Sequence, residues 1–214
     1  MPSIITHAAV PLALWCAADR GRIPAWLLAA GVVAAMLPDA DVLAFALHIP
    51  YADAFGHRGA SHSLLFAFVL AALAAALAFF GSGRPLSGPR GPRSRRPWSA
   101  VSCQPRLAPT KAGPTVTSTL QAAVFVFICA ASHPLLDAMT SGGLGVALAW
   151  PWSEQRFFAP WRPIRVSPFA PQFFSARGVA TLLSELRWVW LPLATAVVAW
   201  KLIQPAPVTP RDPS

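Results

Sequence analysis

The sequence has few charged residues, few cysteines and very few acidic groups. Only 12% of its 214 residues are charged, about half the ~25% of an average soluble domain, and there are three cysteines and eight Asp or Glu. So few cysteines exclude a disulfide-stabilised scaffold. The hydrophobic content of 55% excludes a chain that is disordered throughout, because disordered chains are poor in apolar residues. Long apolar runs separated by basic segments instead favour a membrane protein.

Five apolar stretches are candidates for membrane helices, although the first is short for a span of ~20 residues. They cover residues 4–18, 23–37 (extending towards 49), 64–80, 120–139 and 188–203. We predict an all-α fold, a multi-pass membrane helical bundle with about five membrane helices, formed by one integral membrane domain over residues 1–204. A cleaved signal peptide is the alternative for the first stretch. Its first basic residue, Arg20, follows the apolar run, whereas a signal peptide carries its charge before it, so we expect this helix to be retained.

Three further segments have a different composition. Residues 81–118 contain seven Lys or Arg, seven Pro and no acidic residue, which predicts a long flexible cytoplasmic loop. Residues 205–214 are predicted to form a disordered tail. Residues 140–187 are rich in Trp, Phe and Pro, and we expect them to be ordered but irregular, lying on the membrane surface.

The basic residues predict the orientation of the chain. If it starts outside and crosses five times, eleven of the 17 Lys and Arg are cytoplasmic and six are outside, as the positive-inside rule requires. The formal net charge of +9 is then mainly a topology signal. We expect membrane lipids as partners and no nucleic acid, because the basic loop has no aromatic residue except Trp98 on which bases could stack. The sequence does not indicate an oligomeric state.

His and Asp residues recur at the predicted outer ends of the apolar stretches. An ionisable group at membrane depth costs at least ~2.5 kcal/mol, so it tends to be functional or paired. Neutral imidazole and carboxylate are the usual ligands of Zn²⁺ and also suit Mn or Fe. Their convergence predicts a site for a divalent metal, with zinc favoured. The candidate ligands are His7, Asp39, Asp41, His57, His62, His133 and Asp137.

The spacing of these residues supports the site but leaves alternatives open. His133 and Asp137 are four residues apart and share a helix face, provided that Pro134 leaves the helical turn intact. Asp39 and Asp41 cannot share a helix face, but a turn at the preceding proline can direct both inward. Each pair alone also fits a structural role, as a helix cap or as a polar pair inside a bundle. His57 and His62, taken alone, also fit ordinary loop residues.

Several motifs occur in a fixed order along the chain: Thr6-His7, Leu37-Pro38-Asp39-Ala40-Asp41, His57-Arg58-Gly59-Ala60-Ser61-His62-Ser63 and His133-Pro134-Leu135-Leu136-Asp137, followed by Thr140, Gly142, Trp150-Pro151-Trp152 and Arg156-Phe157-Phe158. They resemble those of the YdjM-type family of bacterial inner-membrane proteins, described as metal-dependent hydrolases. The resemblance covers about residues 3–175 without the Pro/Arg-rich loop, and it implies the inner membrane as the location. In the topology that the basic residues predict, the N-terminus and the site are on the outer face.

The order of these residues is also similar, more distantly, to the ligand order of zinc-dependent phospholipase C and P1-type nucleases. That similarity implies His7, one of Asp39 or Asp41, one of His57 or His62, His133 and Asp137 as ligands. It further implies Asp137 as a bridge between two metals. The chain lacks further histidines after Asp137, so one or two metals are expected rather than three.

The sequence therefore predicts a membrane-embedded metal-dependent hydrolase that acts on a phosphoester or ester of a lipid-like or small-molecule substrate. The metal would lower the pKa of a bound water towards ~7. Whichever of Asp39 and Asp41 is not a ligand would accept the proton, and Arg58 would stabilise charge on a phosphoryl or carboxylate oxygen or anchor the chain at the interface. The alternative is a non-enzymatic membrane protein whose metal or polar site is structural or transports an ion.

Overall fold

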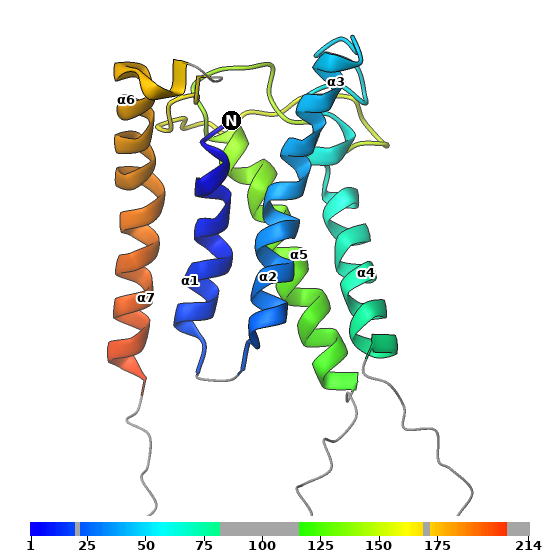
Figure 1. The fold of residues 1–214 in the computed structure, drawn as a ribbon, viewed down its shortest axis with the longest axis vertical. Helices are drawn as coiled ribbons and strands as arrows, with labels where there is room; N and C mark the ends of the chain where they lie inside the picture. The colour runs from blue at the N-terminus through cyan, green and yellow to red at the C-terminus, as the bar shows by residue number, and fades with distance from the viewer. Residues whose placement is uncertain (20–21, 82–115, 169–171, 205–214) are drawn as a thin grey trace, which may run out of the picture.

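The computed structural model describes residues 1–19, 22–81, 116–168 and 172–204 (Figure 1). Most of the predicted flexible loop, residues 82–115, and the whole predicted tail, residues 205–214, lie outside the described residues.

The described residues form an all-helical fold, as predicted, with no strand among them and only two isolated bridges. Labels with η mark 3₁₀ turns, except η5, which is a π-helical turn. The elements are η1 (Ile4–Ala8), α1 (Ala9–Ala17), α2 (Ala25–Met36), η2 (Leu37–Val42), α3 (Leu43–Ala46), η3 (Ala60–His62), α4 (Leu64–Gly81), α5 (Val116–Ala138), η4 (Gln172–Phe174), α6 (Ala176–Glu185), η5 (Leu186–Trp190) and α7 (Leu191–Ile203).

These elements join into five upright helical stretches, each of which overlaps one of the five predicted apolar stretches (Figure 1). Within the described residues three of them are long and apolar enough to cross a membrane: Ala25–Ala46, Ser118–Ala138 and Ala176–Ile203. The other two, Ile4–Ala17 and Leu64–Phe80, are apolar but shorter. The chain is therefore a helical membrane protein. Lipid demands this class of fold, because a helix satisfies its own backbone hydrogen bonds.

The last stretch begins at Ala176, twelve residues before the predicted start at residue 188. The prediction of irregular structure is therefore wrong for residues 176–187. The reason is that α6 is not an apolar run: it buries one face, at Gly178, Thr181 and Glu185, with a spacing of three to four residues that is typical of a helix. At 28 residues the stretch is about 42 Å long, more than the ~30 Å hydrocarbon core, so part of it extends beyond the apolar layer.

The core of the bundle lies between α2, α4 and α5, and it is built largely from alanine. Small residues let helix backbones approach closely, which is the main way in which helices associate in lipid. Gly31 of α2 is an example, since a Cβ atom there would lie 2.5 Å from Phe125 Cε1 of α5. Helix α1 packs beside α2 on one side and α7 on the other (Figure 1).

The two ends of the bundle differ. The N-terminus and residues 47–63, 139–168 and 172–175 gather at the upper end in Figure 1, while the end of α1, the start of α2 and the end of α7 lie at the opposite end. The candidate ligands predicted from the sequence all belong to elements at the upper end, where the irregular segments cover the bundle.

Candidate metal centre

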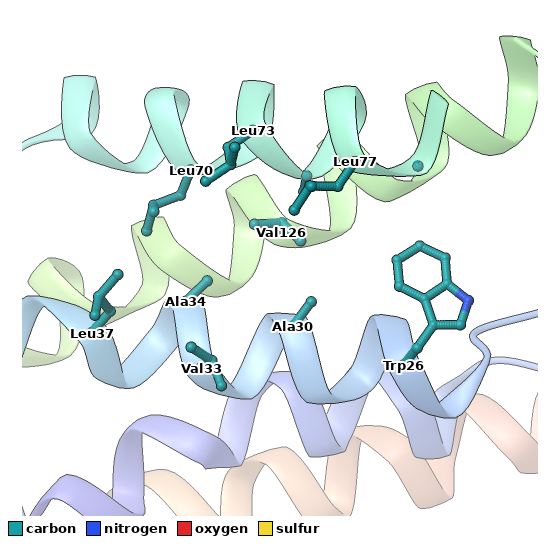
Figure 2. Close-up of a pocket in the computed structure, with 11 residues that line it drawn as sticks. Trp26, Ala30, Val33, Ala34, Leu37, Leu70, Leu73, Leu77 and Val126 are labelled. Carbon is teal, nitrogen blue, oxygen red and sulfur yellow. The ribbon is translucent and has the colours of Figure 1, made fainter. Parts of the chain in front are cut away.

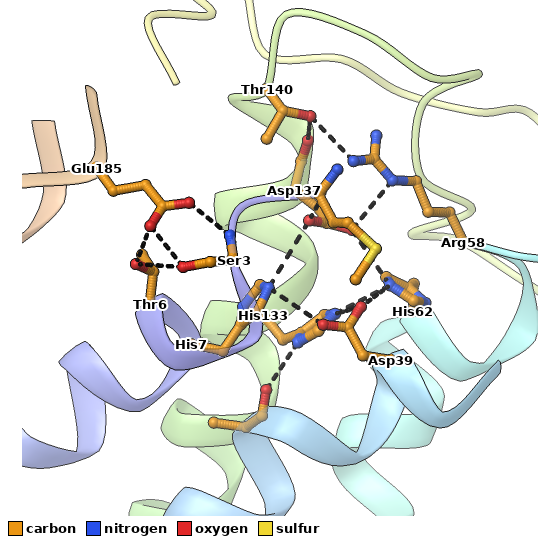
Figure 3. A network of polar contacts seen from close by, with 12 residues as sticks. Ser3, Thr6, His7, Asp39, Arg58, His62, His133, Asp137, Thr140 and Glu185 are labelled. Carbon is orange, nitrogen blue, oxygen red and sulfur yellow. Dashed lines mark hydrogen bonds and ion pairs between the residues drawn. The ribbon is translucent and has the colours of Figure 1, made fainter. Parts of the chain in front are cut away.

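Four elements place side chains around one buried point at the upper end of the bundle (Figure 3). The side chains are His7 from η1, Asp39 from η2, His62 from η3, and His133 and Asp137 from α5, and all five are buried. Asp39, His62, His133 and Asp137 each offer one ligand atom, and these four atoms all lie within 4.8 Å of one another. This group could hold a metal ion.

Local backbone geometry directs these side chains. Helix α5 continues through Pro134, so His133 and Asp137 lie on one face of it, as their spacing predicts. The segment around Asp39 is a 3₁₀ turn that begins beside a proline. With about three residues per turn, Asp39 and Asp41 point to different sides of this element. The structure places Asp39 in the centre and Asp41 outside it.

The atoms of the centre approach one another closely. Nε2 of His62 lies 3.2 Å from Oδ2 of Asp137 and 3.9 Å from Oδ1 of Asp39. Nε2 of His133 lies 3.4 Å from the same Asp39 oxygen and 2.9 Å from Nε2 of His62. Two imidazole nitrogens and two carboxylates thus face a common space.

The outer nitrogens of the two rings decide which atoms carry protons. Nδ1 of His133 lies 2.7 Å from the carbonyl oxygen of Ala35, which can only accept, so this nitrogen donates. Nδ1 of His62 lies 3.1 Å from the Asp41 carboxylate and donates in the same way. In the neutral rings both Nε2 atoms are then bare and face each other. This is the tautomer in which histidine binds a metal, with its other nitrogen held by a second group.

The carboxylates of the centre lack hydrogen-bond donors among the described residues. Asp39 is 3% exposed and Asp137 is fully buried, yet none of their four oxygens accepts a hydrogen bond there. Arg58 Nε lies 3.1 Å from Asp137 Oδ2 as an ion pair without hydrogen-bond geometry. A buried carboxylate without compensation costs several kcal/mol. A bound cation would supply that compensation, so the residues present fit a metal ion.

His7 also faces the centre, although it lies outside the group of four. Its Nε2 is 3.7 Å from Asp39 Oδ2 and 3.9 Å from Asp137 Oδ1, and its ring stacks on that of His133 with centroids 3.7 Å apart. Neither ring nitrogen has a hydrogen-bond partner in the described part of the chain. His7 is therefore placed as a fifth candidate ligand.

Asp41 acts on the centre from behind His62. It accepts hydrogen bonds from the backbone N–H of Arg58 at 2.9 Å and the Ser61 hydroxyl at 2.9 Å, and it contacts Nδ1 of both His57 and His62. A carboxylate on the outer nitrogen of a ligand histidine fixes its tautomer and orientation. The position of Asp41 matches this supporting role.

Of the two loop histidines, the structure brings only His62 into the centre. His57 lies behind Asp41, and its ring contacts the rings of Phe45 and Tyr51 with centroids 5.5 Å and 5.2 Å apart. The sequence left this pair open, and the distinction depends on the loop geometry between them.

Arg58 is buried beside the centre, with 1% of its surface exposed, so it is not an interfacial anchor. Its guanidinium pairs with Asp137 and donates to the Thr140 hydroxyl at 3.0 Å and the Gly142 carbonyl at 3.1 Å. Its backbone has a φ of 61°, a strained conformation for a side chain of this size. These contacts offset part of the charge of Asp137 and orient it.

Burial lowers the pKa of His62, but the nearby carboxylates of Asp137 and Asp41 outweigh this effect and raise the pKa to about 9. Without a cation, the centre therefore holds a proton on this ring at neutral pH. A metal that binds there has to displace this proton, so binding is linked to pH.

Comparisons with known proteins agree with these observations. A family model described as YdjM inner membrane protein matches residues 1–208 of the chain. The Escherichia coli (strain K12) protein named inner membrane protein YbcI is 41% identical to the chain over 204 residues, which cover 94% of this chain and 99% of the relative. No solved structure matches the chain significantly.

Proposed function

The chain belongs to the YdjM family of inner membrane proteins, and on that premise we propose that it is a metal-dependent hydrolase embedded in the inner membrane. One observation carries the proposal: two buried carboxylates without hydrogen-bond donors among the described residues meet the Nε2 atoms of two histidines in a space of a few ångströms. The five side chains that would hold the metal are Asp39, His62, His133 and Asp137, with His7 as the fifth.

The residue types favour zinc, with manganese or iron as the alternatives. A divalent metal held here would supply a water of lowered pKa and polarise the bond to be broken. Asp39, whose oxygens accept no hydrogen bond among the described residues, is a candidate ligand and would also be the candidate proton acceptor. Asp41 is already occupied by several donors, so it orients His62 instead. Arg58 lies 3.1 Å from Asp137 Oδ2, the same oxygen that His62 approaches, and limits the negative charge of the centre.

We further propose a lipid-like substrate, with a phosphoester or ester at the centre and an acyl chain in an adjacent groove. Figure 2 shows this groove, which has a volume of about 650 Å³ and lies between α2 and α4, with Val126 of α5 at its floor. Its lining is mostly apolar, and along α2 and the start of η2 it extends from Trp26 to Leu37, two residues before Asp39. The helical rise from Trp26 to Leu37 is about 16 Å, close to half of the ~30 Å hydrocarbon core. A single acyl chain of one leaflet has this length.

The second candidate is a closed structural metal site in a non-enzymatic membrane protein. It is favoured by the burial of the centre, since none of the five candidate ligands is more than 3% exposed. A structural site is closed, whereas a catalytic site keeps an open position for water or substrate.

Metal content tests the shared part of both candidates. We expect purified wild-type protein in detergent to retain about one or two divalent ions per chain and the His133→Ala variant to lose them. The exposed His48 gives a matched control: His48→Asn keeps a residue that tolerates its φ of 56° and is expected to keep the metal. Equal metal content in wild type and His133→Ala would contradict the metal centre.

Turnover then separates the two candidates. The metal-loaded protein is assayed against phospholipids in mixed micelles and against short-chain phosphoesters and esters. A hydrolase is expected to release product from lipid substrates, and removal of the metal by a chelator is expected to abolish this release. A protein that binds metal tightly without turning over any of these substrates supports the structural site instead.

A further inference from the structure

Glu185 is a buried acidic residue that the sequence analysis did not single out. It is the last residue of α6, within the long apolar stretch Ala176–Ile203, and only 1% of it is exposed. A buried carboxylate in such a stretch is costly and is usually paired or functional. Its partners therefore need to be identified.

Within the described part of the chain, the donors that Glu185 receives all come from the N-terminal segment (Figure 3). One carboxylate oxygen accepts the backbone N–H of Ser3. The other accepts the Ser3 hydroxyl and, at 2.7 Å, the Thr6 hydroxyl. These bonds join residues about 180 positions apart in the sequence, so Glu185 fastens the start of η1 to the last helical stretch.

The π-helical turn η5 gives this contact a second component. It follows Glu185 directly and ends at Trp190. In a π-helical turn the hydrogen bonds join residues five apart, which brings residues five apart towards one face, whereas a regular α-helix would separate them. Glu185 and Trp190 accordingly both reach Thr6, whose hydroxyl donates to Glu185 and accepts from Trp190 Nε1 at 3.1 Å. Turns of this kind inside helices occur frequently at functional sites.

His7 directly follows the residue that these two side chains hold. Neither of its ring nitrogens has a hydrogen-bond partner in the described structure, so no such bond to the side chain sets its position. The backbone of η1 has to do so, and that backbone is tied at Ser3 and Thr6. The ring of His7 also stacks on that of His133, but stacking does not fix how a ring is rotated within its own plane.

We propose that Glu185, supported by Trp190, is a positioning residue that holds His7 in the metal centre. The inference rests on the proposed metal centre and adds the last helical stretch to it. Glu185 does not face the metal itself. It acts through η1 in the way that outer groups commonly orient metal ligands, where their loss lowers metal affinity about 10- to 100-fold.

A double-mutant cycle with zinc affinity as the readout tests this role. Glu185→Ala is expected to weaken zinc binding about tenfold in the wild-type background and to have no further effect in the His7→Ala background. Glu185→Gln keeps the shape and one acceptor, and we expect it to cause a smaller loss. Exposed Glu154 provides the control, since Glu154→Gln removes the same charge away from the centre.

If Glu185 only stabilises the fold, its replacement weakens zinc binding equally with and without His7, and this result would overturn the proposal. Should Glu185→Ala not fold, Ser3→Ala and Glu185→Gln complete the same cycle. Visible absorption of bound Co²⁺ gives a second readout: the Glu185→Gln spectrum is expected to shift towards that of His7→Ala, and an unshifted spectrum argues against the role. Failure of wild type to bind any zinc or cobalt would instead overturn the metal centre itself.

Discussion

At the scale of single residues, two carboxylates two positions apart have different environments. Asp39 has no hydrogen-bond donor among the described residues and faces three imidazoles, whereas Asp41 accepts several hydrogen bonds and faces the loop before α4. The motif alone could not distinguish them, because the distinction depends on a 3₁₀ turn and on contacts from residues 57–62. The difference makes opposite predictions for matched substitutions.

Asp39→Asn is expected to remove metal binding almost completely, because it deletes a charge that faces the ion directly. Asp41→Asn is expected to weaken binding only about 10- to 100-fold, because it loosens the orientation of His62 without removing a ligand. Zinc affinity measured by competition with a chromophoric chelator checks both. Asp53, exposed and outside the centre, provides the control Asp53→Asn. Equal losses for the Asp39 and Asp41 variants would contradict the assignment.

Metal binding is expected to strengthen with rising pH. Burial lowers the pKa of His62, but the nearby carboxylates of Asp137 and Asp41 raise this pKa to about 9 in the metal-free protein. Below that pH the ion has to displace a proton from His62, so the affinity is expected to fall about tenfold for each unit of pH, while above it the dependence levels off. Zinc titrations between about pH 6.5 and 8.5 measure the slope. A flat profile over this range would show that His62 is not protonated in the metal-free centre.

At the scale of elements, α2 and α5 fit together through a glycine. A Cβ atom at Gly31 would lie 2.5 Å from Phe125 Cε1 and 3.0 Å from Cys129 Sγ. The two helices carry most of the centre between them: α5 supplies His133 and Asp137, and η2 follows α2 directly with Asp39. A larger side chain at this crossing is therefore expected to disturb both the helix packing and the candidate metal centre.

Gly31→Leu is expected to lower the free energy of unfolding by about 1–3 kcal/mol and to weaken metal retention, because overpacking pushes α2 away from α5. Ala29→Leu, on the exposed side of the same helix, is the matched control and is expected to leave both unchanged. Thermal unfolding in detergent, followed by tryptophan fluorescence, gives the first quantity and elemental analysis the second. Equal behaviour of the two variants would mean that the α2–α5 crossing tolerates a larger side chain.

The sequence pattern predicted most helices of the bundle but missed one. Apolar runs located the five helical stretches, because a helix in lipid needs apolar side chains over most of its length. The same criterion missed α6, whose buried face is small and polar at Thr181 and Glu185. The periodic spacing of these residues was the available signal.

At the scale of the whole molecule, the polar centre lies at one end of an apolar bundle. The N-terminus and residues 47–63, 139–168 and 172–175 share that end, while the end of α1, the start of α2 and the end of α7 share the other (Figure 1). The positive-inside rule predicts that the end with the centre faces outward, since eleven of 17 basic residues are on the other side in this topology.

Reporter fusions check this orientation. A reporter that is active only in the cytoplasm is expected to give a signal when fused within residues 82–115 and none when fused next to Glu154 in the α5–α6 connection. A reporter active only outside is expected to give the reverse pattern. The opposite result for both fusions would place the metal centre on the cytoplasmic side and leave the site itself intact.

The sequence by itself determined the class of the fold and the set of candidate site residues. Apolar length requires membrane helices, and His and Asp are too costly at membrane depth to occur there without partners. Only the tertiary structure decided which of these candidate residues lie together in the centre. His62 rather than His57, Asp39 rather than Asp41, and a network from Glu185 to the start of the chain all depend on contacts between distant segments. Such contacts arise from helix packing and loop geometry, which local spacing does not encode.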